Sequence, residues 1–134
     1  MKYLLSILML CAAMQAQSFM VSSSKLPDAP SQRRFWTAEN KAGFGILAGL
    51  IAADAITTQR GLSEGMHEIN PIMRPLVTRG AAGQAAGSAL GFGAGVGVAY
   101  WLHRTHHYKA ERIAMGMMIA GECGFVANNI IALR

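Results

Sequence analysis

Charged side chains are scarce in this 134-residue chain: they make up 14% of the residues, against 52% that are hydrophobic. A soluble domain carries about 25% charged residues. The shortage of charge excludes a disordered, highly charged chain, which has too little apolar material to fold. It also argues against a coiled coil, whose flanking positions carry charged pairs. The two cysteines, Cys11 and Cys123, are too few for a disulfide framework.

The sequence signatures of common enzymes are also missing. The chain has no Ser–His–Asp set, nucleophile elbow, Walker loop or dinucleotide fingerprint, and the Gly91-x-Gly93 pair lies in an apolar run rather than after a strand. His67-Glu68 does not continue into the H-E-x-x-H pattern of zinc proteases. A net charge of +5 without a basic face argues against nucleic-acid binding. We therefore expect no cofactor and no nucleic-acid partner, and the sequence leans away from an enzyme.

What the chain does contain is three long apolar runs, at residues 42–58, 81–102 and 113–133. Each approaches or exceeds the ~17–25 residues that a helix needs to cross a bilayer. The second run holds six glycines, and each would cost ~1 kcal/mol in a water-exposed helix. Glycine is tolerated in a bilayer, where the backbone has no better partner than its own helix. We predict an all-α bundle of three transmembrane helices over residues 41–134.

An N-terminal signal and a tether precede the bundle in this interpretation. Residues 1–18 have the parts of a secretory signal in order: a cation at Lys2, an apolar segment, and small residues at Ala16 and Ser18. Cleavage after Ser18 is expected, and an uncleaved anchor is the alternative. Residues 19–40 hold two prolines and no apolar period, which predicts a disordered tether. The expected location is the bacterial inner membrane, with several crossings and the tether outside the cytoplasm.

The distribution of cations opposes this orientation. The signal would leave four cations in the cytoplasm (Arg60, Arg74, Arg79 and Arg134) and seven outside (Lys25, Arg33, Arg34, Lys41, Arg104, Lys109 and Arg112). The positive-inside rule favours the reverse. Translation from Met20 would remove the signal and satisfy the rule. The three signal parts in order favour the first orientation, and both remain open.

Small residues recur every four positions along all three runs. They are Gly45 and Gly49 in the first, Gly83, Gly87, Gly91 and Gly95 in the second, and Gly116, Ala120 and Gly124 in the third. This spacing lets helix backbones approach closely inside lipid. Packing within the chain is the favoured interpretation, and a homo-oligomer packed through the same glycines is the alternative.

Polar side chains interrupt the first and third runs. Asp54, Thr57 and Thr58 share one face of the first helix, and an intramembrane carboxylate is by default a functional-site hypothesis. The third run adds Glu122, Asn128 and Asn129. Asp54 and the two asparagines lie at similar distances from the ends of their spans, and those ends are on the same side of the membrane. We therefore expect these side chains at one depth in the bilayer. We therefore predict a polar pocket that opens toward loop 59–80. The alternative is that these side chains only form hydrogen bonds between helices.

Glu68 and Asn70 lie just beyond that pocket, in the segment Glu68-x-Asn70-Pro71. The pattern D-x-x-T-T at residues 54–58 followed by E-x-N-P resembles an uncharacterised family of short prokaryotic membrane proteins. The resemblance covers roughly residues 42–133. It implies a membrane bundle and draws attention to the carboxylates and the Asn-Pro turn, but it carries no assigned activity.

Interfacial segments border the runs. Arg33-Arg34-Phe35-Trp36 combines cations with aromatic rings, which suits a membrane–water interface. His103, His106 and His107 have helical spacing that could hold Zn²⁺ or Cu²⁺. The neighbouring cations oppose metal binding, so contact of this loop with anionic lipid headgroups is favoured.

Three classes of function follow from these features. The first is a non-enzymatic structural or accessory membrane protein with a polar intramembrane pocket. The second is a glycine-packed homo-oligomeric channel or ion path, and the third is an intramembrane enzyme using Asp54 and Glu68. The lipid bilayer is the expected partner.

Overall fold

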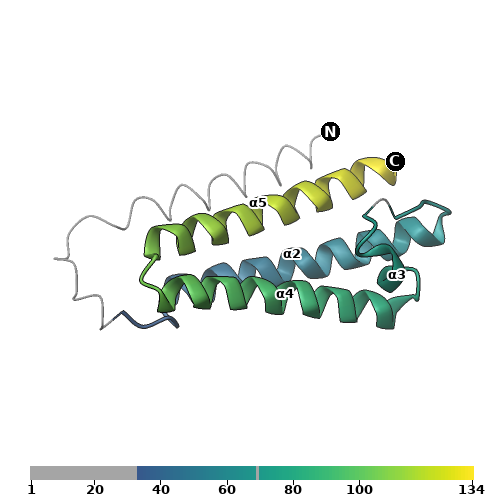
Figure 1. Ribbon diagram of the computed structural model, residues 1–134. Coiled ribbons are helices and arrows are strands. Elements are labelled where there is room, and N and C mark those ends of the chain that lie inside the picture. The colour runs from purple at the N-terminus through teal and green to yellow at the C-terminus, as the bar shows by residue number, and fades with distance from the viewer. Residues whose placement is uncertain (1–32, 69) are drawn as a thin grey trace.

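The computed structural model describes residues 33–68 and 70–134, so the predicted signal and most of the predicted tether lie outside the described residues. All the regular elements of the described part are helices, labelled as in Figure 1. They are α2 (Ala38–Ser63), α3 (Arg74–Val77), α4 (Ala81–Arg104) and α5 (Tyr108–Ala132).

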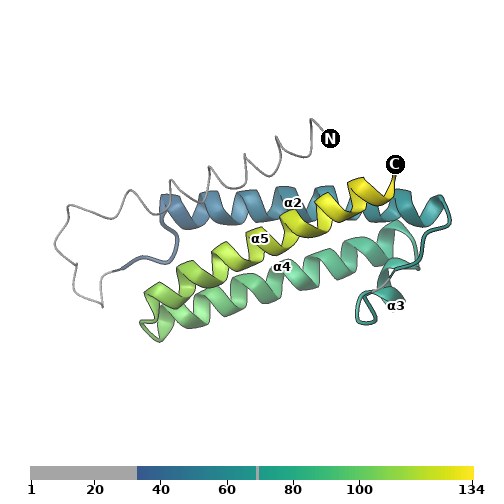
Figure 2. The ribbon, with the colours of Figure 1, turned by 90° about the horizontal axis from the view of Figure 1, so that it is seen from above.

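The three long helices lie side by side and alternate in direction (Figure 1). One end of the bundle carries residues 33–37 and the turn between α4 and α5, and is called the arm end below. The other end carries loop 64–80 with the short helix α3, and the C-terminus lies there too. Helix α5 crosses α2 obliquely (Figure 2).

Length and surface chemistry identify the three long helices as membrane spans. They contain 26, 24 and 25 residues and are apolar enough to cross a bilayer. Their large apolar side chains also point outward, where water would oppose them and lipid would not. Exposed examples are Ile56, Leu90, Ile113, Met117 and Phe125. The described chain is therefore a multi-pass membrane bundle, which confirms the predicted fold class.

The first span begins earlier than expected. Helix α2 starts at Ala38 because Thr37 caps it, and the Thr37 hydroxyl accepts a hydrogen bond from the Asn40 amide at 3.1 Å. Phe35, just before the cap, is buried. Residues 33–40 are therefore not part of a disordered tether, because an aromatic anchor and a helix cap fix them against the bundle.

Three left-handed backbone positions, Gly65, Gly80 and His106, lie in the connections. Gly80 precedes α4 with φ of 78°, a conformation that glycine adopts at little cost. His106 has φ of 61° in the turn between α4 and α5. Because α4 ends at Arg104, His106 and His107 do not continue its face.

The core lies toward the arm end. Phe35, Phe44, Leu47 and Ala99 form a buried cluster joined by methionine and isoleucine side chains. The Phe35 ring packs at 5.8 Å from that of Phe44 and at 5.3 Å from that of Tyr100. These aromatic contacts hold the segment before α2 against α2 and α4.

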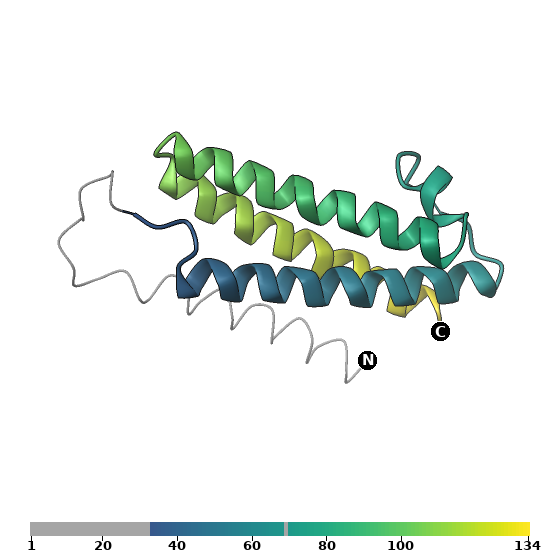
Figure 3. The same ribbon diagram turned by 90° about the horizontal axis from the view of Figure 1, so that it is seen from below.

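The small residues divide into two sets. Gly83 and Gly87 lie under the 73–79 segment, which Figure 3 shows beside the start of α4, and Gly95 lies under Met118 of α5. In contrast, a Cβ at Gly45, Gly49, Gly91, Gly116 or Gly124 would meet no heavy atom of residues 33–68 and 70–134 within 4 Å. Ala120 is also exposed. Among the described residues, methionine side chains and α3 fill the space beside Gly83, Gly87 and Gly95, whereas small-residue packing at the other positions stays a prediction.

Candidate functional site

A single asparagine side chain joins α5 to α2 inside the bundle. The Asn129 Nδ2 group donates toward Asp54 Oδ1 at 2.9 Å, Thr58 Oγ1 at 3.0 Å and Thr57 Oγ1 at 3.2 Å. An amide nitrogen has only two hydrogens, so the three oxygens share them. All four side chains are half-buried. We call this set the Asn129 cluster.

Helical geometry explains why these groups meet. Asp54, Thr57 and Thr58 stand three and four residues apart, so their side chains project from one face of α2. The Thr57 hydroxyl also donates to the Ala53 carbonyl at 3.0 Å, which satisfies it within its own helix. The structure thus brings together four of the predicted site residues at one depth.

Two other predicted residues of α5 lie apart from the Asn129 cluster. Asn128 is exposed, because it points a full 100° away from Asn129 around the helix. Glu122 is half-buried two turns deeper.

The Glu68–Pro71 segment builds a turn at the edge of the bundle. The Glu68 carboxylate accepts the Asn70 N–H at 2.8 Å, and the Asn70 side-chain oxygen accepts the Ile72 N–H at 3.0 Å. Pro71 fixes its own φ within this turn. The carboxylate and the amide are therefore used to close local backbone hydrogen bonds, as in other Asx turns.

The turn leads into α3, and two glutamines hold α3 in place. Gln59 of α2 donates to the Val77 carbonyl at 2.9 Å and to the Gln84 side-chain oxygen at 3.2 Å. Gln84 is 4% exposed, and Val77 is 1% exposed. Sequence reasoning missed both glutamines, although an amide inside the apolar run of α4 was a visible signal.

A groove of about 690 Å³ runs between α2 and α4. Its walls are mainly alanine and isoleucine, and its polar lining residues are Gln59, Gln84 and Ser88. Asp54, Thr57, Thr58 and Asn129 do not line it. The groove and the Asn129 cluster are therefore different features, and the polar groups of the cluster are turned toward one another.

A second buried polar set lies at the arm end, and sequence reasoning missed it. Glu111 is 5% exposed; its Oε1 accepts from Asn40 Nδ2 at 2.6 Å, and its Oε2 lies 2.9 Å from His103 Nδ1. His103 Nε2 lies 2.9 Å from the Arg33 carbonyl oxygen. Asn40 also donates to the Phe35 carbonyl at 2.8 Å. Three chain segments thus meet at one carboxylate.

The histidines do not form the metal site that their spacing suggested. His103 contacts Glu111, His106 contacts the Tyr108 hydroxyl at 2.9 Å, and His107 contacts Thr105 at 2.9 Å. Within residues 33–68 and 70–134, no group of three His, Cys, Asp or Glu side chains is placed to hold a metal ion. The physical reason is the end of α4 at Arg104, which sends His106 and His107 in other directions.

Comparison with known proteins gives a family and no individual relative. A family model described as a domain of unknown function (DUF5658) matches residues 45–133. No curated protein and no solved structure matches the chain. The matched residues include the Asn129 cluster, the Glu68–Pro71 turn and all of α3 and α4.

Proposed function

Since the chain belongs to the DUF5658 family, whose description names no activity, we propose a function from its own geometry. The protein is a non-enzymatic structural or accessory protein of the membrane, and its intramembrane polar side chains fix helix packing. We place it in the bacterial inner membrane with the arm end outside the cytoplasm.

The observation that carries this proposal is the Asn129 cluster. A reactive or conducting carboxylate needs access to a substrate, an ion or water, whereas Asp54 faces a donor from another helix. Every buried side-chain nitrogen or oxygen of the described residues has a hydrogen-bond partner. The polar groups of the Glu68–Pro71 turn are likewise engaged within the fold. These contacts support a structural role for carboxylate and amide groups that lipid would otherwise penalise.

Asp54 offers a substitution that separates packing from chemistry. Asp54→Asn keeps a side-chain oxygen for Asn129 but cannot ionise. We expect its thermal unfolding in detergent, followed by circular dichroism, to match that of the unchanged protein. Asn129→Leu should lose about 0.6–1.7 kcal/mol of unfolding free energy, the range of interhelical polar contacts in membranes. Asn128→Leu is the matched control and should have no effect, because its side chain is exposed.

The same variants test the function in cells. In a strain whose phenotype depends on this gene, Asp54→Asn should restore growth as fully as the unchanged chain. An ion path or an intramembrane enzyme that uses the Asp54 carboxylate would lose activity in this variant while the protein stayed folded. A stable but inactive Asp54→Asn protein would overturn the proposal.

A further inference from the structure

We propose that the arm end of the bundle binds anionic phospholipid headgroups through one surface assembled from two distant chain segments. Its cations are Arg33 and Arg34 before α2, and Arg104 and Lys109 around the α4–α5 turn. The exposed rings of Trp36 and Trp101 flank them. We call these six residues the basic collar.

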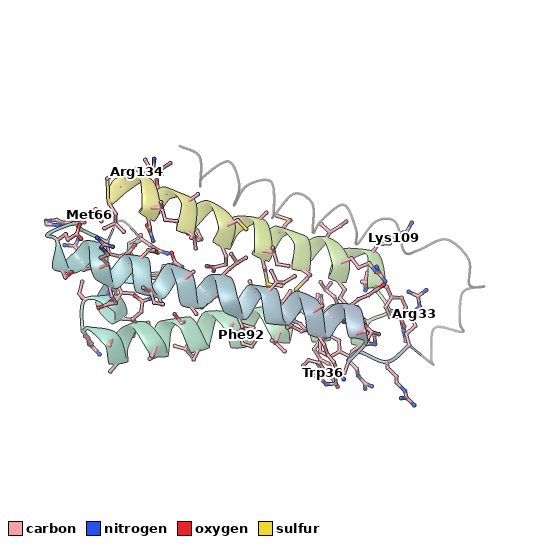
Figure 4. All side chains as sticks on the ribbon, turned by 180° about the vertical axis from the view of Figure 1, so that it is seen from behind. Arg33, Trp36, Met66, Phe92, Lys109 and Arg134 are labelled. Atoms are coloured by element: carbon pink, nitrogen blue, oxygen red, sulfur yellow. The ribbon has the colours of Figure 1, made fainter. Side chains whose placement is uncertain are left out.

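Specific contacts hold the two segments of the collar together. The Arg33 carbonyl oxygen lies 2.9 Å from His103 Nε2, and the Arg33 guanidinium lies 4.7 Å from the centre of the Tyr108 ring. Phe35 is buried and packs edge-on against Tyr100 and His103. Residues 33–36 are therefore fixed beside residues 104–109 by the fold. Figure 4 shows Arg33, Trp36 and Lys109 gathered at this end.

The acidic groups at this end are already occupied. Glu39 pairs with Arg112 at 2.7 Å, and Glu111 is buried against His103 and Asn40. In the described part of the arm end, no other Asp or Glu is present to neutralise the collar. Arg34, Arg104 and Lys109 are exposed. The collar therefore presents uncompensated positive charge to its surroundings.

The position of the collar selects a lipid as its partner. It lies at the ends of membrane-spanning helices, where headgroups of the bilayer lie next to the chain. Trp36 is 57% exposed and Trp101 is 62% exposed, and tryptophan rings prefer the headgroup level. Phosphate oxygens accept hydrogen bonds from arginine in a forked geometry. Cations combined with interfacial rings thus fit an anionic phospholipid.

The opposite end lacks this combination. Arg60 there pairs with Glu64 at 3.0 Å. Both tryptophans of the chain, Trp36 and Trp101, belong to the arm end. Since tryptophan fluorescence reports on this end alone, the chain carries its own probe for lipid binding at the collar.

The test uses the full chain reconstituted in phosphatidylcholine vesicles, with a small fraction of lipid brominated to quench tryptophan fluorescence. The brominated lipid is phosphatidylglycerol in one series and phosphatidylcholine in the other, at equal mole fraction. We expect phosphatidylglycerol to occupy the sites around the tryptophans with about fivefold or greater preference, since one basic residue near an anionic surface contributes about that factor. Added salt should reduce the preference. Both leaflets have the same composition, so orientation does not affect the result.

Two charge-matched variants locate the effect. In the collar variant, Arg34, Arg104 and Lys109 become Gln, and in the control variant Arg74, Arg79 and Arg134 at the other end become Gln. The collar variant should lose the preference for phosphatidylglycerol and retain quenching by brominated phosphatidylcholine, which shows that it is still inserted. The control should keep the preference. Equal quenching by the two lipids in the unchanged protein, or loss of the preference in the control, would overturn the proposal.

Discussion

Glu111 shows how much one residue can contribute to this small bundle. It is a carboxylate that is almost fully enclosed, and it accepts from Asn40 on α2 while contacting His103 at the end of α4. A buried charge is tolerated only when its partners replace water. Glu111 therefore joins all three long helices at the arm end.

Replacing Glu111 by Leu removes the carboxylate that Asn40 and His103 contact, which leaves each of them only a backbone carbonyl, that of Phe35 or Arg33. We expect a loss of about 3–5 kcal/mol of unfolding free energy, as when one partner of a buried pair is removed. Thermal unfolding in detergent, followed by circular dichroism, measures it. Arg112→Gln breaks the half-exposed pair with Glu39 next to it and should cost at most about 1 kcal/mol. Equal stability of the Glu111→Leu and Arg112→Gln proteins would contradict the assigned role.

For single residues, the sequence indicated the Asn129 cluster but not the buried polar set around Glu111. Asp54 and Asn129 stood out because polar groups in apolar runs are conspicuous, and equal distance from the span ends put them at one depth. Glu111 lies among cations just before the third apolar run, in the first turn of α5, where a carboxylate is ordinarily solvated. Its burial depends on Phe35 and Asn40 folding back from more than seventy positions away, which no local pattern reveals.

Among the helices, α4 most clearly contains two kinds of glycine: those that pack against a neighbouring segment and those that do not. Gly83 faces the backbone of α3, where a Cβ would collide with the Leu76 carbonyl oxygen. A Cβ at Gly91 would meet no atom of the described part of the chain within 4 Å. A four-residue repeat cannot distinguish these positions, because the choice depends on where α3 is seated.

The two glycines predict opposite results for the same substitution. Gly83→Ala should lower the unfolding free energy by about 1–3 kcal/mol, the usual cost of overpacking, since a backbone oxygen cannot move away alone. Gly91→Ala should leave stability unchanged or raise it slightly. Both are measured by thermal unfolding in one detergent. A loss at Gly91 equal to that at Gly83 would show that Gly91 packs against a partner, such as a second copy of the chain.

The ends of the helices depend on capping residues and ion pairs more than on the limits of the apolar runs. The apolar run predicted a first span over residues 42–58, whereas α2 occupies Ala38–Ser63. Thr37 sets the start, and the Arg60–Glu64 pair at 3.0 Å lies across the end. Polar residues can extend a span beyond the lipid core at little cost, so a count of apolar residues underestimates its length.

For the whole molecule, three crossings require the two ends of the bundle to lie on opposite sides of the membrane. Of the described cations, six lie at the arm end (Arg33, Arg34, Lys41, Arg104, Lys109 and Arg112) and four at the other (Arg60, Arg74, Arg79 and Arg134). The number of crossings was predictable from three apolar runs. The absolute orientation was not, because the signal and the positive-inside rule favour opposite answers.

Reporter fusions decide the orientation. We expect alkaline phosphatase, which is active only outside the cytoplasm, to be inactive when fused after Arg134 and active when fused after Thr105. The reason is that a secretory signal exports the segment following it, and three crossings then return the C-terminus to the cytoplasm. A fluorescent reporter that matures only in the cytoplasm should give the reverse pattern at both sites. Activity after Arg134 and not after Thr105 would show that the cation distribution, and not the signal, sets the orientation. Equal activity at both sites would contradict the three-crossing fold itself.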